Sequence, residues 1–392
     1  MEDGDWEFYG GSWIASFFDE YSYYGNYSEY EYISHDVVFE DAKAYLIMYI
    51  LTIVISFPGN LCIVLSVWRN KALNAAVWYM LGAISLSLTI QNITIPFFIV
   101  HVIKVSWTFG PALCRFLPFV HMMTITFTCI SLAAMCIIRL LSHSVMKRSF
   151  REHPKYKSAI GVGIIAVISL VFCIPTAIFH SVDNYYGHKF CGPKFPTWRS
   201  QITWHTFHFI VSFAVPFIIL WLVNPLMYFY RRKFFSAMST ETVSYVRQYD
   251  EAQPFNSNNQ SENGDIRLNE CGNTNSSNGH AVLKDDFSFI VGTIDVNSNV
   301  KSENQVTSLL FMLALSFTLL LGPMDIIVTV HYFGAIQFTE TVYKMLMVAH
   351  ILHIFFPASI PLISFAVSTP LRQGIIKPIR NAFPTNILYT KV

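Results

Sequence analysis

Seven long apolar stretches limit the possible fold of this chain more than any other feature of its sequence. They lie at about 44–67, 77–103, 111–138, 158–179, 202–230, 305–333 and 341–367. A helix needs roughly 20 apolar residues to cross the hydrocarbon layer of a bilayer. Only 13% of the residues are charged, against roughly a quarter in soluble proteins. We therefore predict an all-α membrane protein in which seven helices cross the bilayer.

The distribution of Lys and Arg beside these stretches predicts the orientation of the chain. Residues 1–43 carry eleven Asp or Glu and a single Lys, whereas 147–157, after the third stretch, hold five Lys or Arg. Lys and Arg are enriched in short loops on the cytoplasmic side of a membrane. We expect a multi-pass protein of the plasma membrane with its N-terminus outside the cell.

The segments outside the apolar stretches carry modification signals. Asn26 begins the sequon Asn-Tyr-Ser on the side expected to be extracellular, so it is the expected glycosylation site. The run EYSYYGNYSEYEY (20–32) places tyrosines beside acids, as in sulfation substrates, although a plain acidic tail is an equal alternative. The segment 236–303 is polar and has few large apolar residues, so we expect a disordered cytoplasmic loop.

Several motifs in their order and spacing resemble one receptor family. FPGN (57–60) is similar to a Gly-Asn pair in a first membrane helix, and WTFGPALC (107–114) is similar to a first extracellular loop ending in the cysteine that opens helix three. Arg139 follows that cysteine by 25 residues, and Pro323 suits helix six. Together they resemble the rhodopsin-like (class A) G-protein-coupled receptors, as a divergent member of the neuropeptide-receptor type.

The resemblance implies an organisation for the whole chain. It is a seven-transmembrane helix bundle with a short amphipathic eighth helix lying on membrane lipid. The expected parts are an extracellular acidic, Tyr-rich tail (1–43), helices one to five (44–235), the third cytoplasmic loop (236–303), helices six and seven (304–368), and helix eight with the cytoplasmic tail (369–392).

One motif conflicts with this order at first sight. NPLMYFYRRKFF (224–235) contains an Asn-Pro-x-x-Tyr box, which usually ends the seventh helix of such receptors, yet four apolar stretches precede it and two follow the polar loop. We expect it to close the fifth helix as a proline kink with interfacial aromatic and basic anchors.

The resemblance also assigns roles to individual residues. It implies a disulfide between Cys114 and Cys191, which an oxidising exterior favours over two free thiols. It further implies that Arg139 pairs with Glu303 to lock the inactive state for G-protein coupling, although Arg139 could instead reach lipid phosphates. On activation, a heterotrimeric G protein would bind beside Arg139.

The expected ligand site lies inside the bundle. His121 occupies the place where amine receptors carry an Asp, so a peptide ligand suits the chain better than an amine. His121, Asp325 and His350 are the candidate ligand-binding residues. A lone carboxylate within the membrane needs a partner, so Asp325 pairs either with a cation of the ligand or with His121, His350 or His353.

Other residues depart from the family pattern and keep alternative functions open. The family's acid before Arg139 is replaced, as are the helix-two Asp, the helix-six Trp and the helix-seven Asn and Tyr; the replacements are Ile138, Ser85 or Ser87, Leu321, Ile360 and Ser364. A non-signalling seven-helix receptor is therefore an alternative, with a transporter or channel as the less favoured one. The C-terminal Tyr-Thr-Lys-Val392 matches ligands of PDZ-domain scaffolds.

No pattern typical of an enzyme is present, because the sequence has neither a Gly-rich phosphate loop nor a Gly-x-Ser-x-Gly elbow. His350 and His353 alone are a weak metal signal. We expect no catalytic residue, no cofactor, no bound metal and no nucleic-acid partner.

Overall fold

The structure, a computed structural model, describes residues 35–70, 73, 75–104, 106–143, 154–185, 188–230, 303–333 and 339–382. Two compact units are present. One comprises Met1–Met227 with Ser308–Val392 and contains the helix bundle, and the other is Tyr228–Thr307. In the second unit the described residues, 228–230 and 303–307, are helical.

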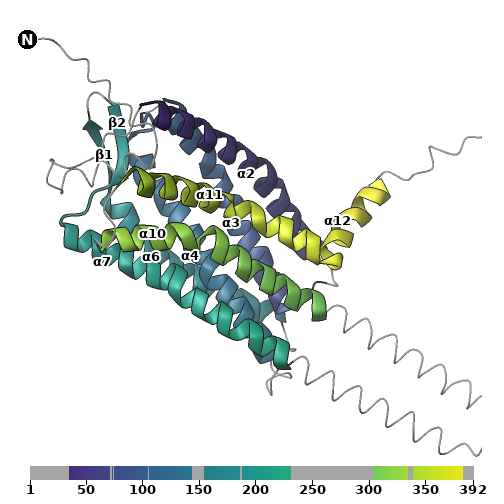
Figure 1. Cartoon of the computed structure of the whole chain (residues 1–392). Helices are drawn as coiled ribbons and strands as arrows, with labels where there is room; N and C mark the ends of the chain where they lie inside the picture. Colours follow the sequence, from purple (N-terminus) through teal and green to yellow (C-terminus); the bar gives the residue numbers. More distant parts are fainter. Residues whose placement is uncertain are drawn as a thin grey trace, which may run out of the picture. The chain divides into compact units, whose positions relative to one another are not determined.

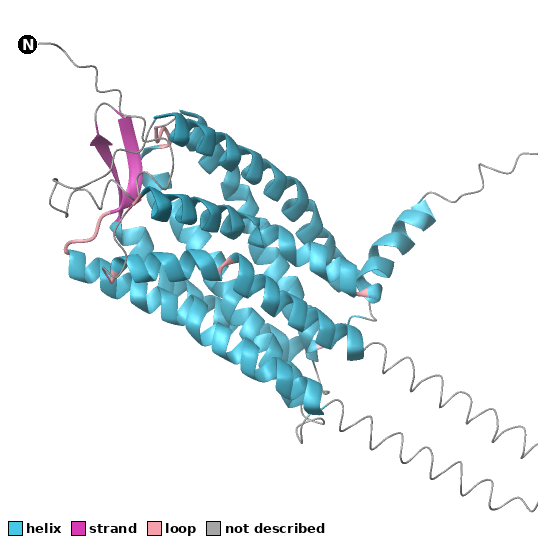
Figure 2. Ribbon diagram, viewed as in Figure 1, coloured by secondary structure: helices cyan, strands magenta, loops and turns pink. Residues whose placement is uncertain are grey.

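Seven described helices are long and apolar enough to cross a bilayer, which confirms the predicted fold class (Figures 1 and 2). Five of the labelled elements are α2 (His35–Arg69), α3 (Ala76–Lys104), α4 (Gly110–His143), α6 (Pro154–Phe179) and α11 (Glu340–Val367). The fifth span, Trp198–Tyr230, begins with α7 (Trp198–Phe209) and the π-helical turn η2 (Ile210–Ala214). The sixth span, Glu303–Tyr332, ends with α10 (Gly322–Tyr332).

Proline shapes several of these helices without ending them. The sixth span is interrupted at Leu321, and Pro323 then occupies the first turn of α10, where its missing N–H is tolerated. In the fifth span the π-helical turn precedes Pro216. The Asn224-Pro-x-x-Tyr228 box lies within this fifth span, as the order of the apolar stretches predicts.

Hydrogen bonds donated by two buried asparagine side chains join three of the helices. The Asn60 amide on α2 donates to the carbonyl of Pro357 on α11 at 3.1 Å. The Asn92 amide on α3 donates to the Ser56 hydroxyl on α2 at 2.8 Å. Since all four residues are buried, the bonds fix how the three helices meet. Asn92 is therefore buried and hydrogen-bonded inside the bundle.

Gly59 allows α2 and α11 to approach closely beside this network. A Cβ atom on Gly59 would lie 2.6 Å from the Cβ of Pro361 and 2.8 Å from its Cγ. The Gly59-Asn60 pair that carries part of the family resemblance thus has two physical roles. Gly59 removes bulk from the contact, and Asn60 supplies the hydrogen bond across it.

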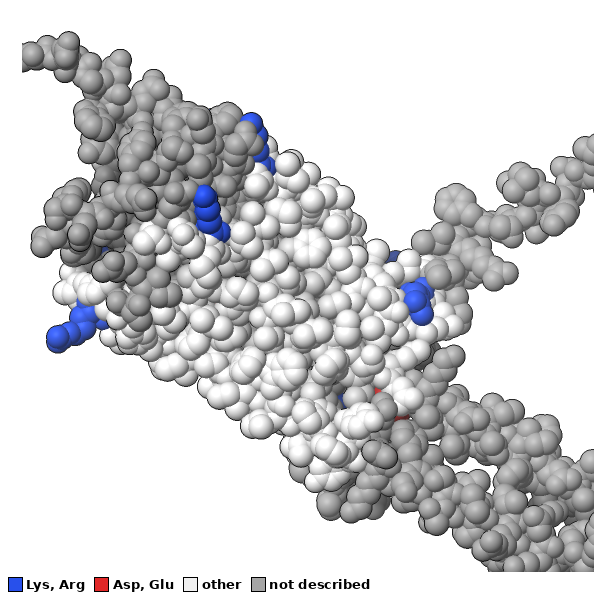
Figure 3. All heavy atoms as spheres, viewed as in Figure 1, with Lys and Arg blue, Asp and Glu red and all other residues white. Residues whose placement is uncertain are grey.

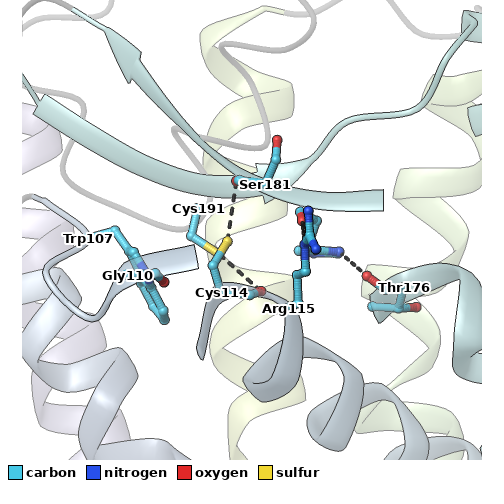
Figure 4. The surroundings of a disulfide bond; sticks show 8 residues. Trp107, Gly110, Cys114, Arg115, Thr176, Ser181 and Cys191 are labelled. Atoms are coloured by element: carbon cyan, nitrogen blue, oxygen red, sulfur yellow. Dashed lines mark hydrogen bonds between the residues drawn. A yellow bond between two sulfur atoms is a disulfide. The ribbon is translucent and has the colours of Figure 1, made fainter. Parts of the chain in front are cut away.

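An antiparallel hairpin that the sequence analysis did not predict covers one end of the bundle (Figure 2). It consists of β1 (His180–Tyr185) and β2 (His188–Pro193), with Val182 opposite Cys191. A disulfide joins Cys191 to Cys114 in the first turns of α4, with the two Cα atoms 5.6 Å apart (Figure 4). The hairpin is therefore held against the third membrane helix, and the disulfide implied by the family resemblance is present.

The helix after α11 lies at the opposite end of the bundle from the hairpin (Figure 1). This helix, α12 (Thr369–Ala382), contacts the end of α2, where the Asn70 amide donates to the carbonyl of Pro370 at 3.4 Å. Its side chains are described as far as Ile375. A helix is thus present where the eighth helix is expected, and its position on the membrane surface stays a prediction.

Candidate functional site

A cavity of about 170 Å³ lies inside the bundle beneath the hairpin. Every one of the seven spans contributes to its wall, and Cys191 and Pro193 of β2 form part of its roof. Typical small-molecule pockets hold roughly 300–1,000 Å³. The cavity therefore has room for one large side chain or the tip of a ligand, while the rest of a larger ligand would stay at the mouth.

Histidine dominates the polar part of the cavity wall. Six histidines line it: His121, His180, His205, His208, His350 and His353. The sequence analysis selected His121 and His350 as ligand contacts and named His353 as a possible partner of Asp325. It missed His180, His205 and His208. The last two are three residues apart and so share one helix face, but this spacing alone does not mark a site.

The predicted ligand residue His121 is held by its surroundings on α4. Its Nδ1 lies 3.2 Å from the side-chain amide of Gln91 on α3, a hydrogen-bonding distance. Its ring contacts Phe98 edge-on, with centroids 5.8 Å apart, and the His353 ring at 6.3 Å. These contacts fix the position of the His121 ring in the cavity wall.

His350 and His353 form the α11 side of the same wall. Their ring centroids are 6.3 Å apart, and the His350 ring packs 5.3 Å from the ring of Tyr45 on α2. The Tyr45 hydroxyl in turn donates to the sulfur of Met347. Tyr45 therefore ties the first helix to the seventh beside the cavity.

Asp325 is the only carboxylate in the cavity wall among the described residues. It lies in the first turn of α10, and its main-chain carbonyl accepts a hydrogen bond from Thr329 at 2.7 Å. The three histidines expected as its internal partners are engaged with Gln91, Tyr45 and one another. Among the described residues, no hydrogen bond or ion pair joins these histidine rings to the Asp325 carboxylate.

A second polar cluster lies between α4, α6 and the fifth span, and its members His208 and Ser212 line the cavity. The Thr126 hydroxyl lies 3.1 Å from the Ser212 hydroxyl, and the His208 Nε2 lies 3.2 Å from Ser212 and 3.5 Å from Thr126. The thiol of Cys173 donates to Thr126 at 3.7 Å. A ligand group that enters beside His208 would meet groups able both to donate and to accept hydrogen bonds.

The fifth and sixth spans meet near the mouth through an aromatic pair. The rings of His205 and Tyr332 stack with centroids 4.2 Å apart, and the Tyr332 hydroxyl lies 2.9 Å from the His205 Nε2. The Gln201 amide also donates to that hydroxyl at 3.3 Å. The two spans are thus joined directly at the end where a ligand would enter.

His180 links the roof of the cavity to the helices around it. Its Nδ1 lies 2.7 Å from the Thr176 carbonyl, and its own carbonyl accepts a hydrogen bond from the Arg115 Nε at 3.3 Å. Burial lowers the pKa of His180 to about 4, against the opposing effect of the Thr176 hydrogen bond. His180 is therefore neutral at neutral pH and donates its Nδ1 proton to Thr176.

Comparison with known proteins identifies the family to which this bundle and its disulfide belong. The sequence model of the 7 transmembrane receptor (rhodopsin family) matches residues 59–363, which is most of the chain. The chain is a member of the rhodopsin family of seven-transmembrane receptors. Members of this family are receptors and not enzymes, in agreement with the expectation from the sequence.

The relatives found include neuropeptide Y receptors. The neuropeptide Y receptor type 5 of Sus scrofa is 22% identical over 195 residues, covering 48% of this chain and 42% of the relative. The receptor of the same name from Rattus norvegicus is 20% identical over 195 residues, which also cover 48% of this chain and 42% of the relative. The matched part therefore spans less than half the length of these relatives.

The expected lock of the inactive receptor is described only in part. Arg139 is half-buried near the end of α4 remote from Cys114, and Glu303 begins the sixth span in the second compact unit. Their pairing stays a prediction. Asn26, the tyrosines of 20–32 and the C-terminal Val392 lie outside the described residues, as does the loop expected at 236–303 apart from Glu303.

Proposed function

We propose that this receptor binds an extracellular peptide with the hairpin end of its bundle and activates a heterotrimeric G protein at the opposite end. The observation that carries the proposal is the cavity beneath the disulfide-anchored hairpin, walled by all seven spans of a rhodopsin-family bundle. A ligand that contacts every span can favour one arrangement of the helices over another if it binds that arrangement more tightly.

The proposed orientation has the N-terminus and the hairpin outside the cell, in the plasma membrane. It rests on the cluster of Lys and Arg at 147–157, after the third span, and on the acidic composition of 1–43. An oxidising exterior also suits the disulfide of Cys114 and Cys191.

The peptide character of the ligand is supported by three observations. The relatives that match are named neuropeptide Y receptors. The cavity has the size of a single large side chain, so a peptide could insert one residue and leave the others at the mouth. His121 occupies the wall position at which an acid would be expected for an amine ligand.

Within this proposal, Asp325 pairs with a cation of the peptide, either an Arg or Lys side chain or its amino terminus. A charge-assisted hydrogen bond inside a cavity is stronger than one at the surface. The alternative pairing of Asp325 with His121, His350 or His353 is less favoured, because those rings have other contacts.

The proposed signalling end contains Arg139 and Glu303. Their separation would free Arg139 for the G protein when the sixth span moves. A non-signalling receptor is the second candidate, favoured by Ile138, Leu321 and Ile360 in place of the family's usual switch residues. A glycan on Asn26 and a PDZ-domain scaffold at Val392 complete the proposed partners.

The experiment is a peptide-library screen on cells that express the receptor, followed by dose–response curves for the peptides that bind. An Asp325→Asn receptor keeps the shape of the side chain and removes its charge. Asp183→Asn, at the mouth and outside the cavity, is the matched control. We expect potency to fall at least about tenfold for Asp325→Asn, corresponding to about 1.4 kcal/mol, with less than threefold change for the control.

Two results would contradict the proposed contact or the proposed function. Unchanged potency of Asp325→Asn at normal surface expression would exclude the ion pair with the ligand. Binding of peptides without nucleotide exchange on any G protein would favour the non-signalling receptor.

A further inference from the structure

The fifth and sixth spans are in contact below the cavity mouth as well as at it. Near the middle of the bundle the rings of Phe213 and Phe317 stack with centroids 5.4 Å apart. Further from the hairpin, the indole Nε1 of Trp221 donates a hydrogen bond to the Thr318 hydroxyl at 2.9 Å. This second contact is directional, so it fixes the relative position of the two spans more narrowly than a ring stack does.

A row of aromatic side chains fixes the position of Trp221 on the fifth span. Successive ring centroids in this row are 5.5, 5.7 and 6.3 Å apart, and its members are Phe209, Phe213, Phe217 and Trp221. They follow one another every four residues, a spacing that drifts about 40° per step around a regular α-helix. A π-helical turn closes its main-chain hydrogen bond one residue later than an α-helical turn, so η2 takes up part of this drift. Trp221 therefore stays on the side of the fifth span that faces the sixth.

The sixth span orients the acceptor of the Trp221 hydrogen bond. The Thr318 hydroxyl donates its only proton to the Ala314 carbonyl at 2.9 Å. Its oxygen keeps lone pairs that can accept the Trp221 N–H. The Trp221 ring also meets Phe311 edge-on, with centroids 6.2 Å apart. The indole is thus held against the sixth span by one hydrogen bond and one ring contact.

The hydrogen bond lies near the lipid-facing side of the bundle. Trp221 and Thr318 are half-buried, and the residues that follow them, Leu222 and Leu319, are 63% and 57% exposed. In Figure 3 uncharged side chains cover the face on which the two spans lie, and the charged ones drawn gather toward its ends. An indole N–H that left Thr318 would face hydrocarbon, where no water replaces the lost partner. Separation of the two spans therefore costs this bond without a replacement from solvent.

The sixth span can bend on the hairpin side of Thr318. Its helix is interrupted at Leu321, and Pro323 has no N–H for the carbonyl of the residue four positions earlier. Helices bend at such points. Tyr332 holds α10 to the fifth span. The part before the interruption, 308–320, can therefore tilt away from the fifth span while α10 stays in place, and such a tilt breaks the bond at Thr318.

We infer that the hydrogen bond between Trp221 and Thr318 restrains the sixth span against the fifth in the resting receptor, with Trp221 as a positioning residue. Neither residue is among the described residues that line the cavity. A ligand therefore breaks the bond only indirectly, by binding more tightly to an arrangement in which the two spans are apart. The consequence at the G protein rests on the proposed function, whereas the restraint itself does not.

The test is the distance between the two spans in the full-length receptor, reconstituted in nanodiscs without ligand or G protein. Spin-labelled unnatural amino acids at the exposed positions Leu226 and Ser308 report this distance by pulsed electron paramagnetic resonance, and the native cysteines stay unlabelled. Trp221→Phe removes the N–H and keeps an aromatic ring. We expect it to raise the ratio of the longer-distance to the shorter-distance population at least about threefold, or about 0.7 kcal/mol, within the range for hydrogen bonds between membrane helices.

Variants of the acceptor provide the controls. Thr318→Val removes the acceptor and should raise the ratio as much as Trp221→Phe does, whereas Thr318→Ser keeps the hydroxyl and should leave the ratio unchanged. Thr329→Val is the matched control, because it also deletes a hydroxyl that donates to the carbonyl four residues earlier on the sixth span; it should leave the ratio unchanged. The double variant Trp221→Phe with Thr318→Val should exceed neither single variant, since both remove the same bond.

Unchanged ratios in both Trp221→Phe and Thr318→Val, an equal rise in Thr329→Val, or additive effects in the double variant would each overturn the inference. If Trp221→Phe does not reach the membrane, the contrast between Thr318→Val and Thr318→Ser decides. Basal nucleotide exchange is measured on the same receptors and should rise in Trp221→Phe and Thr318→Val. Distances that respond while no G protein does would contradict the proposed function and leave the restraint standing, so the two failures are distinguishable.

Discussion

Gly59→Ala should destabilise the receptor more than any comparable change of a glycine on its lipid-facing surface. The new Cβ would lie 2.6 Å from the Pro361 Cβ, whereas carbon atoms pack best at roughly 3.5–4.0 Å. The two helices must therefore separate by about 1 Å, because the proline ring cannot rotate away as a flexible side chain would.

The magnitude follows from the contacts that the separation disturbs. Overpacking of this kind costs about 1–3 kcal/mol. Loss of the 3.1 Å bond from Asn60 to the Pro357 carbonyl adds about 0.5–1.5 kcal/mol. The higher helix propensity of Ala offsets at most about 1 kcal/mol of this destabilisation. We expect a net destabilisation of about 1–3 kcal/mol.

Gly163→Ala supplies the matched control. Gly163 is exposed on α6, and a Cβ there would have open space around it. The control should be neutral or slightly stabilising, so the two variants should differ by several degrees in a thermal melt of the detergent-purified receptor. Surface expression, measured by flow cytometry, should fall for Gly59→Ala alone. Equal melting temperatures for the two variants would refute the close-packing argument.

Further predictions concern the disulfide, the cavity and the proposed lock. Replacing Cys114 and Cys191 by Ser opens a loop of 77 residues; the chain-entropy relation gives a loss of about 4.5 kcal/mol, seen as reduced surface expression, and recovery of both cysteines alkylated without prior reduction would contradict the bond. Asp325→Asn should lower peptide potency about tenfold or more, as measured by dose–response curves at matched expression. Glu303→Gln should raise basal nucleotide exchange by releasing Arg139, and unchanged basal exchange would exclude that restraint.

The fold could be predicted from the sequence because a membrane restricts which backbone structures can span it. Each span must satisfy its own main-chain hydrogen bonds in an apolar solvent, so a long apolar run can only be a helix or part of a closed barrel. The number of such runs also placed the Asn-Pro-x-x-Tyr box of 224–228 in the fifth span, although in related receptors such a box usually ends the seventh helix. The start of α2 at His35 was not apparent, since its first turns are polar.

The hairpin and most of the cavity were harder to predict. The segment HSVDNYYGHKFCGP (180–193) lacks a strong alternation of apolar and polar residues, so the sequence does not predict its two strands. The pairing of the strands is apparent only in the structure, where Val182 lies opposite the disulfide-bonded Cys191. His205 and His208 have no periodic pattern that marks a site. Their role depends on α4 and α10 meeting the fifth span, which is a tertiary contact. Conversely, Asp325 was found from the sequence because a charge within an apolar span is rare.

The central claim is that a peptide bound beneath the hairpin activates a G protein through this bundle. The direct measurement is nucleotide exchange on purified heterotrimers of each G-protein class by the receptor reconstituted in nanodiscs, with each peptide that binds in the screen. We predict that at least one peptide accelerates exchange on one class and that Asp325→Asn shifts its dose–response curve at least about tenfold. Saturating peptide that leaves exchange unchanged on every class would contradict the account.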